Sequence, residues 1–281
     1  MRDASPGFAD ARARVRCAAT AMLAVVVVGA GATPVRAQSA ATRLAAVRDG
    51  QVRFTFTLRP GVCGQGQNVW RTGVSRTRTR TTLDTDERRD VEYDVECDSG
   101  PGRVVIDKNE GAITDVRFYI GGRWRASAAA ADLGAVGARE TSQILLAIVQ
   151  GEGGRVSERA IFPLTLIDSV DVNGDLLRIA RNDTRPSSTR KQAVFWLGQA
   201  AEGPATAGLT ELVGEAALNR DVREQAVFAL SQRPRDEGVP SLINVVRTNR
   251  DPEIRRKALF WLGQSGDPRA VDLIEELLTR R

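Results

Sequence analysis

The stretch KQAVFWLGQ at residues 191–199 recurs twice further along the chain. It returns as QAVFALSQ at residues 225–232 and as KALFWLGQ at residues 257–264, and a fainter copy, RAIFPL, occupies residues 159–164. The phenylalanines of the four copies follow one another at spacings of 33, 33 and 32 residues. A fixed period in this range is typical of repeat arrays, so the second half of the chain is expected to consist of repeated units.

The hydrophobic pattern of residues 139–281 has the 3.6-residue period of α-helices. Each unit reads as two helices whose apolar faces need cover from a neighbouring unit. The predicted fold class is α+β by domain, with a small antiparallel β domain at residues 47–126 followed by an α-α solenoid at residues 139–281. Four helix pairs and a closing helix are expected in the solenoid, over residues 140–150, 156–169, 174–182, 187–200, 207–217, 221–232, 239–248, 252–264 and 268–281.

The third copy carries a resemblance to a known family. Residues 251–267, DPEIRRKALFWLGQSGD, resemble a HEAT repeat, and Val222 and Arg223 in the second copy fit the same pattern. Together with RPGVCG at residues 59–64, the repeats make the whole chain similar to exported bacterial HEAT-repeat proteins with a cysteine-containing β domain. The resemblance implies a binding scaffold whose second helices line the concave face.

One stripe on the second helices is the candidate partner surface. Polar residues fall on this stripe, and two tryptophans lie beside it. Aromatic residues bordered by polar groups suit protein interfaces, so the hypothesis is that the stripe binds a protein or peptide. The alternative is that the tryptophans pack between repeats and the glutamines are merely solvated. The candidate residues are Gln192, Trp196, Gln199, Gln225, Gln232, Lys257, Trp261 and Gln264.

Three arginines recur at one position of the repeat, Arg190, Arg223 and Arg255. Acidic residues such as Asp221 and Asp251 stand close to them in the sequence. We expect these residues to form a structural ladder of ion pairs rather than an anion-binding site.

The first 37 residues have the order of a secretory signal peptide. A basic front that includes Arg12, Arg14 and Arg16 precedes an apolar run at residues 17–32, and small or aliphatic residues stand at the −3 and −1 positions before a cut after Ala37. Cleavage there predicts a periplasmic or secreted protein that meets the membrane only transiently, during export. The alternative is a retained membrane anchor, although the run is shorter than the roughly 20 residues of a typical span.

Residues 47–126 show the two-residue alternation of half-buried strands. Strands are expected at residues 52–58, 76–81, 91–96, 103–107 and 113–120, with linkers at residues 38–46 and 127–138. Trp124 is expected to pack on the sheet as a core residue, the alternative being a ligand platform.

Cys63 and Cys97 remain once the leader is removed, and Cys63 stands in a glycine-rich stretch that reads as a loop. An even number of cysteines in an exported chain predicts a disulfide, against the alternative of two free thiols. Closing a loop over a 34-residue separation could stabilise the fold by roughly 3–4 kcal/mol.

Charge and composition argue against several classes of function. The net charge is +5, and the leader with five arginines and two aspartates accounts for +3 of it, so residues 38–281 carry +2. This is weak support for nucleic-acid binding. The alternating Arg76, Arg78 and Arg80 are expected to face the acidic strand at residues 91–96 in a solvated hairpin, the alternative being an anion- or nucleic-acid-binding ridge. The chain contains no histidine, which removes Ser-His-Asp catalysis and histidine-ligated metal sites.

The expected function is therefore that of an exported, non-catalytic scaffold or adaptor that binds a protein or peptide. No catalytic residue, cofactor or metal ligand is expected, and no nucleic acid is expected as a partner. The alternative is an enzyme-associated role, similar to HEAT-type bilin lyases, which requires a small-molecule pocket with convergent polar groups.

Overall fold

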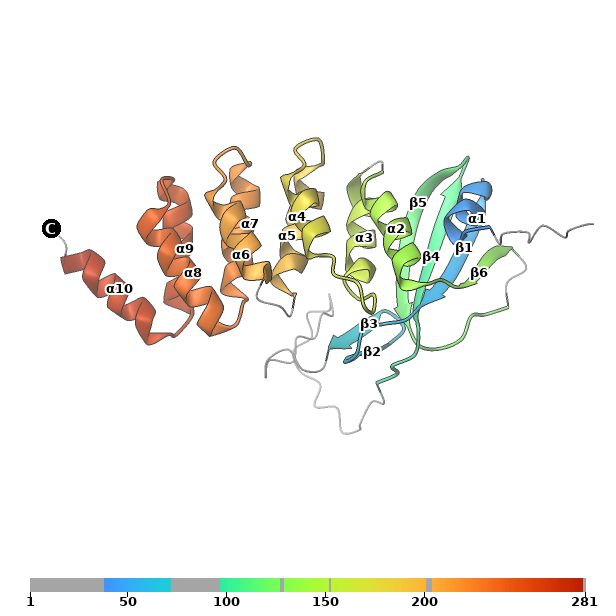
Figure 1. The fold of residues 1–281 in the computed structure, drawn as a ribbon, viewed down its shortest axis with the longest axis horizontal. Coiled ribbons are helices and arrows are strands. Elements are labelled where there is room, and N and C mark those ends of the chain that lie inside the picture. The colour runs from blue at the N-terminus through green and yellow to red at the C-terminus, as the bar shows by residue number, and fades with distance from the viewer. Residues whose placement is uncertain (1–37, 72–96, 127–128, 152, 201–203, 280–281) are drawn as a thin grey trace, which may run out of the picture. The chain divides into compact units, whose positions relative to one another are not determined.

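The computed structural model describes residues 38–71, 97–126, 129–151, 153–200 and 204–279, which belong to one compact unit, Gln38–Arg281 (Figure 1). The predicted leader at residues 1–37 lies outside the described residues. So do the basic row at Arg76–Arg80 and the strands expected at residues 76–81 and 91–96. Within the described residues, no helix is both long and apolar enough to cross a membrane.

A four-stranded sheet forms the first part of the described chain. Its strand order is β5-β4-β1-β6, and the three strands β5, β4 and β1 pair antiparallel, as predicted. Alternate residues of β1 are buried, including Val52, Phe54 and Phe56, so one face of the sheet lies against the core. The bounds of the strands are β1 Gly50–Phe56, β4 Gly102–Asn109, β5 Ala112–Ile120 and β6 Ala130–Ala135.

Both segments predicted as linkers contain regular structure. Residues 38–46 include helix α1 (Ala40–Ala46), whose Ala40 and Leu44 are buried in the core and whose Ser39 hydroxyl accepts the Thr42 amide hydrogen bond. Burial of these residues stabilises the helix, although the small and polar composition of the segment suggested a linker.

Residues 127–138, the second predicted linker, include strand β6, which pairs parallel to β1. Its sequence AADLGA has low strand propensity, so pairing with the open edge of β1 and burial of Leu133 decide its conformation. The sheet is therefore mixed, because the structure adds one parallel strand to the predicted antiparallel set.

The glycine-rich stretch around Cys63 is a two-stranded hairpin rather than the expected loop. Strands β2 (Val62–Gln65) and β3 (Asn68–Arg71) pair antiparallel, and Cys63 forms the predicted disulfide with Cys97, with the two Cα atoms 5.3 Å apart. The Gly64 amide donates a 2.8 Å hydrogen bond to the Asp98 carbonyl, so the segment after Cys97 is also held by the backbone.

Four helix pairs and a closing helix follow, as predicted for the solenoid (Figure 1). The second helices of successive pairs pack on one another, α3 on α5, α5 on α7 and α7 on α9. The helices are α2 Ala138–Val149, α3 Gly154–Leu164, α4 Asn173–Arg181, α5 Ser187–Gly198, α6 Pro204–Gly214, α7 Arg220–Ser231, α8 Arg235–Thr248, α9 Pro252–Gln264 and α10 Pro268–Thr279.

The first helix pair shares a core with the sheet. Helix α3 ends at Leu164, five residues before the predicted end, directly after Pro163. The chain then returns to the segment after β1, where the Arg59 amide donates to the Leu166 carbonyl at 3.0 Å and the Asp168 amide donates to the Thr57 carbonyl at 3.1 Å. Leu166 is fully buried at this junction, so the first helix pair is packed against the segment after β1.

Trp124 differs from its predicted role as a core residue. It is half-buried and lies with the guanidinium groups of Arg53 and Arg103 over its ring. Arg53 alternates with the inward-facing Val52 and Phe54, so this contact lies on the face of the sheet opposite the core.

Candidate functional site

Equivalent residues of α5, α7 and α9 lie on successive helices that pack on one another. Each of these helices carries a phenylalanine with a polar residue three positions before it and another four positions after it, at the last residue of the helix or its C-cap. Residues at these offsets share one face of a helix. We call this surface the second-helix stripe; it consists of Gln192, Phe195, Gln199, Gln225, Phe228, Gln232, Lys257, Phe260 and Gln264.

All six predicted polar residues belong to the second-helix stripe, and their side chains differ in exposure. Gln192, Gln199, Gln225 and Lys257 are half-buried, whereas Gln232 and Gln264 are exposed. The Lys257 ammonium group lies 3.3 Å from the Glu224 carboxylate and so ties α9 to α7. The Gln232 side-chain amide donates to the Ser231 hydroxyl at 3.2 Å. The stripe therefore presents amide groups to solvent at the carboxyl ends of α7 and α9.

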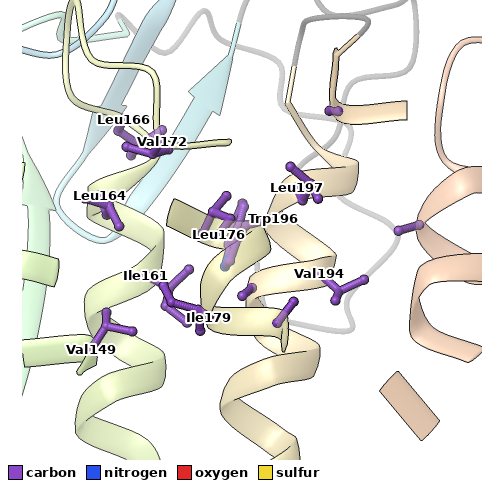
Figure 2. Packing of buried hydrophobic residues seen from close by; sticks show 14 of the residues in the cluster. Val149, Ile161, Leu164, Leu166, Val172, Leu176, Ile179, Val194, Trp196 and Leu197 are labelled. Atoms are coloured by element: carbon purple, nitrogen blue, oxygen red, sulfur yellow. The ribbon is translucent and has the colours of Figure 1, made fainter. Parts of the chain in front are cut away.

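The two predicted tryptophans lie beneath this surface rather than on it. Trp196 is 8% exposed and belongs to the buried cluster that also contains Ile161 and Leu176 (Figure 2). Trp261 is half-buried, and its ring centroid lies 5.0 Å from that of Phe228 in the preceding second helix. The indole nitrogens of both tryptophans are buried and have no hydrogen-bond partner within the described residues. In the free protein these residues are packed between repeats.

The phenylalanines are the site residues that sequence reasoning missed. Phe195 and Phe228 are half-buried, and Phe260 is 55% exposed. Edge contacts with the following tryptophan, at 5.1 Å for Phe195–Trp196 and for Phe260–Trp261, orient two of them. The signal was present in the sequence, because these are the residues that define the repeat period.

The prediction that three arginines form a ladder of ion pairs is wrong for two of them: among the described residues only Arg223 pairs with a carboxylate, whereas Arg190 and Arg255 donate to backbone carbonyls. Arg223 is 6% exposed, donates to the Val213 carbonyl at 3.1 Å and pairs with Asp251 at 3.1 Å. Arg190 is 2% exposed and donates to the Ala180 carbonyl at 2.9 Å. Each of these two side chains donates a hydrogen bond to a backbone carbonyl at the C-terminal end of the preceding first helix and so caps that end.

Arg255 and the acidic residues complete this set. Arg255 donates to the Asn249 carbonyl at 2.8 Å, whereas Asp221 accepts a hydrogen bond from Ser187. That bond lowers the pKa of Asp221, with burial opposing it. For Asp251, burial alone would raise the pKa, but the Glu253 amide and the nearby arginines outweigh it and lower the pKa. Both carboxylates are thus ionised and engaged at neutral pH.

Comparison with known families agrees with this geometry. The family model described as HEAT repeats matches residues 206–281, from α6 to α10. Residues 206–281 are HEAT repeats. The 33-residue period and the pairing of helices continue upstream of the matched region, to α2. Among curated proteins, no sequence matches the chain. HEAT repeats typically mediate protein–protein interaction, and the chain has the solenoid scaffold suited to it.

Proposed function

We propose that this protein is a non-catalytic scaffold that binds a protein or peptide along the second-helix stripe. The observation that carries the proposal is the repetition of a polar–Phe–polar set, partly or fully exposed, on three successive second helices. A partner segment laid across these helices meets an aromatic ring on each one. The flanking amides can donate to and accept from its backbone or side chains.

The buried tryptophans support this surface from below. Trp196 and Trp261 fix the distance between neighbouring second helices through their contacts with Phe162 and Phe228. A preorganised surface loses little conformational entropy on binding, which favours affinity. In this proposal the tryptophans position the stripe, and the phenylalanines and polar residues contact the partner.

The experiment that tests the proposal begins with affinity capture of a partner by the full chain from an envelope fraction. Binding is then measured by calorimetry for the double variant Phe195→Ala/Phe228→Ala. We expect the Kd to rise by about tenfold or more, because central aromatic residues carry most of the energy of an interface.

The matched control is Val271→Ala/Leu277→Ala, which removes apolar groups that are exposed on α10, outside the stripe. We expect this control to change the Kd less than about threefold, within the usual effect of a residue outside the interface. An equal loss in both double variants, with folding intact, would remove the second-helix stripe as the binding surface.

We also propose that the scaffold works outside the cytoplasm, after removal of residues 1–37. The order of basic, apolar and small residues before Ala37 supports this part of the proposal. The intact mass of the protein isolated from its native cells provides the test. A chain that starts at Gln38 is the expected result, and a chain that keeps the leader contradicts it.

A further inference from the structure

The face of the sheet opposite the core carries a row of arginines. Val52 and Phe54 of β1 are fully buried on the inner side, so Arg53 between them faces outward. On the neighbouring strand, Arg103 is paired with Thr55 of β1 and with Tyr119 of β5. Successive residues of a strand point to opposite faces, so these outward residues lie on one surface.

A short loop after β5 folds over this surface and is held from three sides. The Asp98 carboxylate accepts the Gly122 amide hydrogen bond at 3.1 Å. Arg103 donates to the carbonyls of Gly121 and Gly122 at 2.7 and 2.6 Å, and Arg53 donates to the carbonyl of Arg125 at 3.0 Å. These contacts fix the backbone on both sides of Trp124.

The loop and the sheet line a cavity of about 1270 Å³ that is open to solvent. Trp124 lines it, and the guanidinium carbons of Arg53 and Arg103 lie 5.2 and 4.9 Å from the centre of its ring. Contacts of this kind hold both cations in place on an aromatic platform. Arg123 and Arg125 also line the cavity, and their side chains are exposed.

The positive charge of this cavity is only partly neutralised. Arg53 pairs with Asp132 at 3.0 Å. The Asp98 carboxylate accepts hydrogen bonds from backbone amides. No carboxylate in the described part of the chain forms an ion pair with Arg103, Arg123 or Arg125. Within the described residues, the exposed Arg123 and Arg125 are therefore the cavity arginines that an anionic ligand can pair with, whereas Arg103 is held by the loop carbonyls.

We propose that this cavity binds an acidic peptide segment, with carboxylates on Arg123 and Arg125 and an apolar side chain against Trp124. Guanidinium groups match carboxylates in a two-bond geometry, and the fixed loop presents them in advance. The volume accommodates several residues, more than a single small anion requires.

The test is a fluorescence-anisotropy titration of the full chain, with its disulfide intact, against labelled peptides. The probe is a short peptide of alternating glutamate and leucine, and the comparison peptide has glutamine in place of glutamate. The test variant is Arg123→Gln/Arg125→Gln, because no described contact of the fold depends on these side chains. The control variant is Arg139→Gln/Arg155→Gln, which removes two exposed arginines from α2 and α3.

We expect the glutamate peptide to bind and the glutamine peptide to bind at least about tenfold more weakly. The test variant should weaken binding of the glutamate peptide about tenfold or more, and the control variant less than about twofold. Equal losses in the two variants, equal binding of the two peptides, or no binding would each overturn the proposal. Tighter binding of a single-stranded oligonucleotide than of the glutamate peptide would overturn it in favour of a nucleic-acid site.

Discussion

The indole ring of Trp196 in α5 stacks on the phenyl ring of Phe162 in α3, with the ring centroids 4.5 Å apart and an interplanar angle of 24°. Trp261 and Phe228 occupy the corresponding positions of α9 and α7, with ring centroids 5.0 Å apart and the rings tilted at 56°. Between α5 and α7 the residue at the tryptophan position is Ala229, which lies against Gly198. Aromatic pairs and a small-residue contact thus alternate as spacers between successive second helices.

Replacing Trp196 by alanine should destabilise the fold strongly. The change leaves a cavity beside Phe162 in a well-packed interior, and losses of about 3–5 kcal/mol are usual for such substitutions. Phe260→Ala is the control, because Phe260 is 55% exposed and its loss should shift the unfolding free energy by less than about 1 kcal/mol. Urea unfolding followed by circular dichroism measures both. Similar losses for the two variants would contradict the packed position of Trp196.

The small-residue contact predicts that a Gly→Ala substitution changes the stability of the fold in opposite directions at two equivalent glycines. A Cβ atom on Gly198 would lie 2.8 Å from the Cβ of Ala229, whereas one on Gly263 of α9 meets nothing within 4 Å. Gly198→Ala should therefore destabilise by about 1–3 kcal/mol through overpacking. Gly263→Ala should be neutral or stabilise by at most about 1 kcal/mol, because alanine is the better helix former. Thermal unfolding of both variants decides whether the signs differ.

The repeats could be predicted from the sequence because their signal is periodic and local. The positions of nine helices from α2 to α10 follow from the apolar pattern and its 33-residue recurrence, and the structure agrees to within a few residues at most ends. The exception is α3, where the chain leaves the helix after Pro163 to contact the sheet. A contact with a distant segment leaves no periodic trace in the sequence.

The less predictable parts depend on such distant contacts. Strand β6 and helix α1 are alanine-rich and become ordered through β1 and the core. The exposure of Phe260 and the burial of Trp196 also depend on which neighbour covers each side of a helix. Periodicity places a phenylalanine and the residue after it at fixed positions of each second helix. It does not say which of the two the adjacent repeat covers.

Acid should weaken the attachment of α10 through Asp267. Hydrogen bonds from the Arg269 side chain lower the pKa of Asp267 to about 2, with burial opposing them. A carboxyl group whose pKa is lowered in the folded state contributes stability above its unfolded pKa and loses it as the pH falls. The loss should lie between about pH 4 and about pH 2.

The variants Asp267→Asn and Arg269→Met test this pH dependence. Each should show a shallower decline of the unfolding temperature across that interval than the unchanged protein, because neither retains the charged pair. Calorimetry at a series of pH values provides the measurement. A decline as steep in both variants as in the unchanged protein would show that other carboxyl groups govern the acid response.

The loop over the sheet should depend on Gly121 more than on Gly122. Both have positive φ angles, 65° and 67°, so alanine at either position carries about 1–2 kcal/mol of left-handed strain. A Cβ atom on Gly121 would also lie 2.0 Å from an oxygen of Asp98, whereas one on Gly122 meets nothing within 4 Å. Gly121→Ala should therefore lower the unfolding free energy further than Gly122→Ala. Equal losses in urea unfolding would contradict the described packing of the loop.

Site-specific photo-cross-linking in native cells tests the binding role of the second-helix stripe most directly. A photoreactive benzoyl-phenylalanine is placed at Gln232 or Gln264, which are exposed on the stripe, and at Ala207 or Asn244, which are exposed on the first helices α6 and α8. The account predicts that the two stripe positions yield an adduct with the same protein and that the two first-helix positions do not. Adducts confined to the first helices, or none at any of the four positions, would contradict it.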